Sequence, residues 1–367
     1  MILRNPNFIA ILILLIATSL FPESTKAQSD SIKSHQVLFF PVLTRSIETD
    51  WSFGVASSST FRFSKKDTAS RTSNFQALIL YSLKKQFVAA INGAQYFHNE
   101  KFILNEQMSY SSFPDKFWGL GKYSKDIDEE SYNFKQYYIY LHLMRHLGNN
   151  IYFGLLFEAQ RLLEIDYKKG GLFDQQQVPG RTPYKIAGLG LSLTYDNRNN
   201  AFSPDKGYFA QLYFNNFNSF LGSDYAYTNI VIDLRKFISF NQKNVLALQT
   251  YSYTNLGKEV PLRSLATLGG MGSMRGYYDG RFRDRQQLVF QAEWRHSFNK
   301  RFGVVAFGNF GDVGHNITDF SFNDLKYTYG AGIRYAINKS ERLNLRVDYG
   351  IGPGNNRGFY FQLGEAF

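Results

Sequence analysis

The feature that most constrains this chain is an alternation of apolar and polar side chains with a period of two, repeated along most of the sequence. Between residues 188 and 196, Leu189, Leu191, Leu193 and Tyr195 alternate with small or polar residues. Residues 327–337 and 343–351 repeat the pattern. Successive side chains of a β-strand point to opposite sides, so such alternation is typical of strands with one apolar and one polar face. The sequence therefore predicts an all-β protein.

Two architectures fit long amphipathic strands: a soluble sandwich, whose apolar faces meet inside, and a membrane barrel, whose apolar faces contact lipid. The composition favours the barrel, because 17% of the residues are aromatic although only 44% are hydrophobic. Tyr and Phe gather at strand ends, where membrane barrels carry aromatic girdles. The chain has no Cys, which excludes a disulfide-rich secreted scaffold. We therefore predict a transmembrane antiparallel β-barrel.

The N-terminal segment is predicted to be a secretory signal peptide. Arg4 precedes residues 8–21, a run in which only Thr18 and Ser19 are polar, and small residues surround Ala27. A transmembrane anchor is the alternative, but this run is shorter than the ~20 residues that a helix needs to span a bilayer. We expect residues 1–27 to be removed and residues 28–367 to form one barrel domain in the bacterial cell outer membrane.

About sixteen strands are predicted, and an even count places both chain ends on the periplasmic side. The long polar connections 111–133, 164–184 and 257–285 are then expected outside the cell, whereas 148–149, 298–300 and 353–356 are assigned to periplasmic turns. The predicted strands span residues 36–46, 51–63, 72–83, 86–98, 101–110, 134–147, 150–163, 185–196, 207–218, 225–238, 243–256, 286–297, 301–312, 326–338, 342–352 and 357–367.

The connection 257–285 contains a glycine-rich stretch from Leu268 to Tyr278 that ends in Arg275, Gly276 and Tyr277. Here the sequence resembles the BamA/TamA superfamily of outer-membrane barrels, also called the bacterial surface antigen family. The resemblance implies that this sixth outer loop folds back into the lumen and carries an Arg-Gly-aromatic tip. Met274 stands where that family usually has Val or Ile. We expect a short form of the family, without its periplasmic substrate-binding domains.

Further motifs follow the family's order along the chain. Its strand-thirteen motif is matched by Phe310, Asp312 and Gly314, and its inward acid on strand twelve by Glu293. Residues 195–207 resemble its turn between strands eight and nine, and residues 348–350 and 364–367 its closing strands. Each motif is weak alone, but together and in order they are specific.

The same residues predict a lock that holds the loop inside the barrel. Glu293 alternates with the apolar residues of its strand and should point inward. Val305, Phe307 and Asn309 are expected to face outward, which leaves Asp312 pointing inward too. An Arg275 side chain between Glu293 and Asp312 would make charge-assisted hydrogen bonds in a partly dry lumen. The alternative is that Arg275 is a solvated loop charge.

The two ends of the barrel wall are expected to form a weak seam. Pro41 in strand one has no amide hydrogen, and Gly364 near the end of strand sixteen permits a bend. The alternative is that Pro41 precedes a later strand start and that Gly364 lies in frayed chain. Four residues of one parity resemble the carboxy-terminal signal read by the insertion machinery of outer-membrane barrels, and these are Phe359, Phe361, Leu363 and Phe367.

Three functions are compatible with the sequence. By resemblance, the barrel inserts or translocates outer-membrane polypeptides through the seam. The alternatives are a passive pore or structural barrel and, as the weakest hypothesis, a barrel enzyme. Expected partners are outer-membrane lipids and lipopolysaccharide, which the formal net charge of +11 favours, and unfolded outer-membrane proteins or a separate periplasmic partner. No cofactor, metal or nucleic acid is expected.

Overall fold

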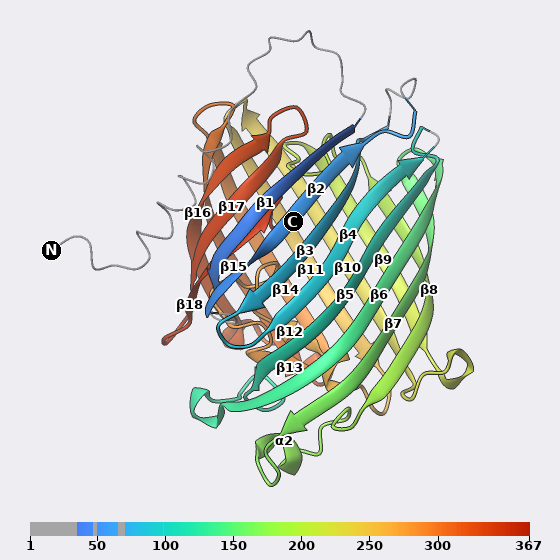
Figure 1. The fold of residues 1–367 in the computed structure, drawn as a ribbon, viewed down its shortest axis with the longest axis vertical. Coiled ribbons are helices and arrows are strands. Elements are labelled where there is room, and N and C mark those ends of the chain that lie inside the picture. Colours follow the sequence, from blue (N-terminus) through green and yellow to red (C-terminus); the bar gives the residue numbers. More distant parts are fainter. Residues whose placement is uncertain (1–34, 47–49, 65–69, 98) are drawn as a thin grey trace, which may run out of the picture.

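The computed structural model describes residues 35–46, 50–64, 70–97 and 99–367 and contains one sixteen-stranded antiparallel sheet that curls into a barrel (Figure 1). The all-β barrel and its strand number are thus confirmed. The predicted signal peptide, residues 1–27, lies outside the described residues. Within the described ranges, no helix is long and apolar enough to cross a membrane.

Strand order in the sheet follows the chain, except that β11 pairs with β14 because β12 and β13 form a separate hairpin. The sheet consists of β1 (His35–Ser46), β2 (Asp50–Phe61), β3 (Ser73–Ser82), β4 (Phe87–Phe97), β5 (Phe102–Phe117), β6 (Glu130–Gly148), β7 (Ile151–Tyr167), β8 (Tyr184–Asp196), β9 (Gly207–Phe217), β10 (Tyr227–Asn241), β11 (Asn244–Leu256), β14 (Gln286–Ser297), β15 (Phe302–Gly314), β16 (Lys326–Asn338), β17 (Leu343–Ile351) and β18 (Arg357–Leu363). The connections contain α2 (Leu172–Gln175), β12 (Ala266–Leu268), β13 (Phe282–Asp284), η1 (Asp126–Asp128), η2 (Ser219–Leu221), η3 (Leu262–Ser264), η4 (Ile317–Asp319) and η5 (Phe322–Asp324).

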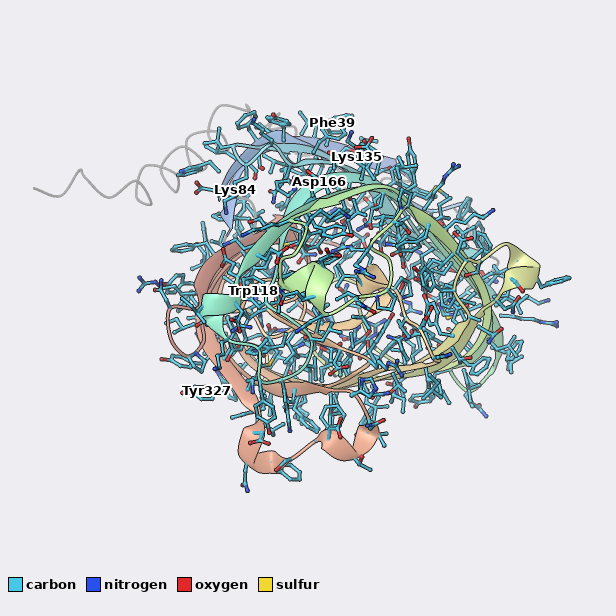
Figure 2. All side chains as sticks on the ribbon, turned by 90° about the horizontal axis from the view of Figure 1, so that it is seen from below. Phe39, Lys84, Trp118, Lys135, Asp166 and Tyr327 are labelled. Carbon is cyan, nitrogen blue, oxygen red and sulfur yellow. The ribbon has the colours of Figure 1, made fainter. Side chains whose placement is uncertain are left out.

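The alternation in the sequence becomes an alternation between lipid-facing and lumenal side chains. In β8, Leu189, Leu191 and Leu193 are about half exposed, whereas Ser192 and Thr194, which alternate with the outward residues, are buried. Figure 2 views the barrel along its axis and shows Phe39 and Tyr327 on the outside of the ring of strands. The outer surface is therefore an apolar, aromatic-rich band, as a membrane-spanning barrel requires.

The two ends of the barrel differ in their connections. One end, the long-loop end, carries the connections 118–129, 168–183, 257–285 and 315–325, and the other is the short-turn end. The assignment of residues 353–356 to the periplasmic turns was wrong, because this turn lies at the long-loop end, where a Cβ on Gly354 would be 3.7 Å from the Asp126 carboxylate. It joins the last two strands of an even set, so its end is fixed by strand order, whatever its length.

Several strands are longer than predicted at the long-loop end. β5 and β6 remain paired as far as Phe117 and Glu130, so the predicted loop 111–133 shortens to residues 118–129. Residues 111–117 are mostly polar, and a strand that continues past the lipid no longer needs an apolar outer face. At the other end of the sheet, β18 stops at Leu363 instead of Phe367.

A hydrophobic cluster closes the lumen at the long-loop end. It is formed by inward side chains of β5 to β10 together with residues of the connections 168–183 and 257–285, and α2 lies over the opening (Figure 2). Phe173 of α2 packs against Phe117, with ring centres 5.1 Å apart. The buried members of this cluster, the apolar seal, are Phe117, Tyr132, Phe134, Leu162, Phe173, Val178, Tyr184, Ile186, Phe217, Tyr227, Val260, Leu262 and Leu265.

Candidate functional site

The long connection 257–285 folds into the lumen, and its tip is a fully buried charged site. Between β12 and β13 the chain reaches Arg275, whose side chain has no exposed surface. Met274 and Tyr277 pack with Phe282, Val289 and other buried residues around the tip. The loop is therefore a packed part of the barrel interior.

The Arg275 guanidinium bridges two strands of the wall. Its Nη2 donates to Glu293 Oε1 of β14 at 2.5 Å, and its Nη1 donates to Asp348 Oδ2 of β17. Its Cζ lies 3.7 Å from the centre of the Phe307 ring on β15. Glu293 and Asp348 are both fully buried. Two charge-assisted hydrogen bonds and a cation–π contact in a desolvated site make a strong attachment, far stronger than a surface ion pair.

The predicted contact between Arg275 and Asp312 was wrong, whereas the predicted partner Glu293 does bind Arg275. Asp348 takes the place of Asp312. The reason lies in β15, where Val305, Phe307 and Asn309 are buried and face the lumen. The prediction that these three residues face outward is therefore wrong. Asp312 instead has the parity of Phe310, which is 55% exposed on the outer face.

Asp312 is covered by another connection of the long-loop end. Lys122 Nζ lies 3.8 Å from its Oδ2 and 3.0 Å from Asp324 Oδ2. The pKa of Asp324 is lowered, chiefly by the hydrogen bond that it accepts from Lys122. Asp312 therefore helps to position the connections 118–129 and 315–325, while Phe310 faces outward and Gly314 is buried at the strand end.

Close backbone packing explains the glycine after Arg275. Gly276 has φ +125°, and a Cβ there would lie 2.9 Å from the carbonyl carbon of Ile351 on β17. Gly350 meets the loop from the other side, since its Cβ would lie 2.5 Å from the carbonyl carbon of Arg275. The Gly276 N–H donates to Tyr360 Oη at 2.9 Å, and Tyr360 Oη donates to the Tyr277 carbonyl at 3.0 Å. A side chain at either glycine would push the tip off the wall.

Three more arginines surround the two acids. Arg295 bonds Glu293 Oε2 at 2.9 Å, and Arg334 bonds Asp348 Oδ1 at 2.5 Å. Arg346 Nε lies 3.6 Å from Asp348 Oδ2. Arg334 also donates to Glu365 of the C-terminal segment at 2.7 Å. The tip of the loop, three wall strands and the C-terminal segment thus share one buried ionic network.

A second attachment, which the sequence analysis missed, fixes the same loop to the opposite part of the wall. Arg263 and Arg283 of the loop donate to Asp115 Oδ2 of β5 at 3.0 and 3.1 Å. The Tyr132 hydroxyl donates to the same oxygen at 2.7 Å. Asp115 lay in a range predicted to be a loop, so its inward direction on a strand could not be read from the sequence. The loop connects β5 with β14 and β17 across the lumen.

The predicted seam lies between β1 and β18. These strands come close to each other, yet no ladder hydrogen bonds join residues 35–46 to residues 357–363, although every other neighbouring pair in the sheet is hydrogen-bonded. Pro41 lies inside β1 opposite Val55 of β2, so the alternative in which it precedes the strand was wrong. Pro41 therefore removes one amide donor from this edge strand.

The chain turns inward at Gly364, where β18 has ended. Gly364 has φ +89° and donates to the Asn344 carbonyl at 2.8 Å. Glu365 then points into the lumen toward Arg334, and Phe367 is buried, with Arg295 donating to its main-chain oxygen at 3.1 Å. The four residues of the predicted carboxy-terminal signal are thus divided: Phe359, Phe361 and Leu363 lie on β18, and Phe367 lies inside.

Comparison with known proteins agrees with this geometry. Residues 92–367 match the model of the Omp85 superfamily domain. The chain belongs to the Omp85 superfamily. This membership confirms the resemblance found in the sequence and places the barrel in the outer membrane. No curated protein matches the chain significantly.

Solved structures show the same fold. BamA from Haemophilus ducreyi lacking POTRA domains 1–3 is 15% identical, with a TM-score of 0.56 over 90% of this chain and 70% of that one. CdiB from Acinetobacter baumannii and CdiB from Escherichia coli are 9% and 10% identical, each with a TM-score of 0.56 over 90% of this chain. The chain spans 60% and 62% of these two CdiB chains. At such identities the likeness shows the fold alone.

Proposed function

We propose that this Omp85 barrel assists the insertion or translocation of outer-membrane polypeptides through the seam between β1 and β18. The observation that carries the proposal is the missing ladder between these two adjacent strands. Unpaired strand edges present N–H and C=O groups that can accept a further strand. A client polypeptide in extended form would supply such a strand, and neither a cofactor nor a catalytic group is required.

The seam is a better route than the lumen because the lumen is obstructed. The apolar seal closes the long-loop end, and the loop 257–285 occupies the interior, where Arg275 holds it to β14 and β17. A passive pore would need both obstacles to move. The seam needs only the separation of two strands that already lack a ladder, which argues against the passive pore.

We also propose a location, an orientation and partners for the barrel. We propose that residues 1–27 direct export and are cleaved after Ala27, and that the short-turn end faces the periplasm. Client polypeptides, or a separate periplasmic partner that delivers them, would then approach the end at which β18 stops. The apolar outer band contacts lipid, and basic residues at the long-loop end contact lipopolysaccharide.

Depletion of the protein followed by quantitative proteomics of the outer membrane tests this function. We expect other β-barrel proteins to decrease in the membrane and to accumulate in the periplasm. Re-expression of the wild-type chain should restore them, and re-expression of a chain whose seam is crosslinked should not. An unchanged outer-membrane proteome after verified depletion would reject the assembly role and favour a structural barrel.

A further inference from the structure

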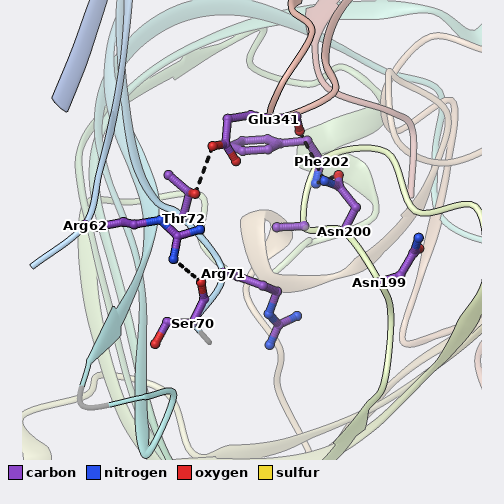
Figure 3. A pocket seen from close by; sticks show the side chains of 9 residues that line it. Arg62, Ser70, Arg71, Thr72, Asn199, Asn200, Phe202 and Glu341 are labelled. Atoms are coloured by element: carbon purple, nitrogen blue, oxygen red, sulfur yellow. Dashed lines mark hydrogen bonds between the residues drawn. The ribbon is translucent and has the colours of Figure 1, made fainter. Parts of the chain in front are cut away.

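Three connections from distant parts of the barrel meet at the short-turn end. They are residues 70–72 before β3, residues 197–206 between β8 and β9, and residues 339–342 between β16 and β17. Figure 3 shows side chains of all three around one pocket, which has a volume of about 230 Å³. Residues 197–206 start at the wall far from the seam and reach the connections on both of its sides.

One hydrogen bond at this place crosses the seam. Thr72 Oγ1 lies 3.0 Å from Glu341 Oε1, with the hydroxyl donating to the carboxylate (Figure 3). Thr72 precedes β3, and Glu341 precedes β17. In the order of the sheet, β2 and β1 lie on one side of the seam between these residues, and β18 lies on the other. The bond therefore joins the two sides of the seam at a point where the strands themselves form no ladder.

The end of β8 and the connection 197–206 reinforce this bond from the far wall. Arg71, next to Thr72, bonds Asp196 at the end of β8 at 2.6 Å. Asn200 Nδ2 donates to the Glu341 carbonyl at 3.2 Å. The end of β8 thus holds the Thr72 side through Asp196, and the connection that follows it holds the Glu341 side through Asn200.

The connection also reaches the inward C-terminal segment. Ser203 Oγ donates to Glu365 Oε1 at 3.4 Å, and Arg342 donates to Asp205 at 2.8 Å. The local fold of residues 197–206 is well defined, because Asn200 Oδ1 accepts hydrogen bonds from the main-chain N–H groups of Phe202 and Ser203 at 2.9 and 2.7 Å. Residues 197–206 are therefore preorganised to contact the Glu341 side of the seam, while Asp196 directly before them binds Arg71 on the other side.

We infer that Arg71, Thr72, Asn200 and Glu341 form a latch that keeps the seam closed at the short-turn end until a client or partner separates them. The inference rests on the proposed function, since it assigns to these residues the control of seam opening. The pocket beside the bond has a polar lining that includes Arg62 and Asn199. Water in such a pocket weakens a hydrogen bond. The latch therefore favours the closed seam over the open one by a small free energy, which a client or partner can overcome.

Hydrogen–deuterium exchange of the full barrel in lipid nanodiscs tests the latch independently of activity. We expect Thr72→Val and Glu341→Ala each to speed amide exchange in β1 and β18 by about tenfold, the factor for losing one hydrogen bond to a charged group at a hydrated site. Exchange in β6 to β11 should not change. Amide exchange in the double variant should be only slightly faster than in either single variant, because both substitutions remove the same bond.

Thr194→Val is the matched control. Thr194 is a buried threonine on β8 whose Oγ1 accepts a hydrogen bond from Gln211 at 2.9 Å, far from the seam. Thr194→Val should leave amide exchange in β1 and β18 at the wild-type rate. If a latch variant fails to fold, the pair Thr72→Cys and Glu341→Cys joined by a short thiol crosslinker replaces it and should slow exchange in β1 and β18.

The outcomes separate the latch from the proposed function. Unchanged exchange in β1 and β18 in both the latch variants and the crosslinked pair would overturn the latch, whatever the protein does in cells. Exchange that responds as expected, together with normal assembly of outer-membrane proteins by the crosslinked form, would confirm the latch and reject assembly through the seam.

Discussion

Replacement of Arg275 by alanine should destabilise the barrel more than any single change at an exposed arginine. The change removes two hydrogen bonds to buried carboxylates, worth ~1.5–3 kcal/mol each, and a cation–π contact of up to ~2 kcal/mol. Arg295, Arg334 and Arg346 remain beside Glu293 and Asp348 and offset part of the loss. We therefore expect the free energy of unfolding to fall by ~3 kcal/mol, the lower end of the range for a broken buried ion pair.

Urea unfolding of the barrel in liposomes measures this loss, and resistance to heat before gel electrophoresis gives a second readout. Arg181→Ala is the control, because its ion pair with Asp174 is about 30% exposed on both sides. Arg181→Ala should change the free energy of unfolding only slightly, because an exposed ion pair contributes little. Asp348→Asn should destabilise clearly more than Asp312→Asn, since only Asp348 binds Arg275. Equal unfolding midpoints for Arg275→Ala and Arg181→Ala would refute the lock.

Three further predictions concern the loops and the orientation. Gly276→Ala should destabilise the barrel by more than ~1 kcal/mol in the same urea assay, because its Cβ would meet β17 and its φ is positive; wild-type stability would contradict the close packing. Asp115→Ala should expose the connection 257–285 to proteolysis, because Arg263 and Arg283 would lose their shared partner; an unchanged digestion pattern would show that the second attachment is dispensable. A tag in residues 118–129 or 168–183 should be labelled on intact cells and one at 298–300 should not, and the opposite labelling would reverse the proposed orientation.

The strand number could be predicted because each membrane-spanning strand repeats one simple constraint. Lipid demands apolar side chains at every second residue, as at Leu189, Leu191 and Leu193, so the period is visible in the sequence. The strand ends were less predictable. Beyond the lipid this constraint disappears, and residues 111–117 of β5 look like a loop although they remain paired with β6.

The lock was predicted in part, for a physical reason. Arg275, Gly276 and Glu293 could be found from the loop motif and from the parity of β14. The second acid could not, because an apolar side chain such as Val305 or Phe307 can face either the lipid or the lumen. Phe307 faces the lumen instead, where its ring supports the guanidinium. Asp348 was visible in the sequence as part of a closing-strand motif, but only the register of β17 places it beside Arg275.

The seam depended on contacts between the two ends of the sheet, which local sequence patterns do not contain. Pro41 and Gly364 indicated its position because each weakens a strand for a local reason. The bond between Thr72 and Glu341 joins residues 269 apart in the chain. Neither residue belongs to a motif, so its role emerges only from the folded barrel.

The most direct test of the account is to close the seam covalently. Because the chain has no Cys, cysteines introduced near residues 40 and 363 can be crosslinked without side reactions at native thiols. We expect the crosslinked barrel to keep its heat-resistant fold but no longer to support assembly of outer-membrane proteins in depleted cells. Cleavage of the crosslink should restore assembly. Full assembly activity in a verified crosslinked form would contradict assembly through the seam.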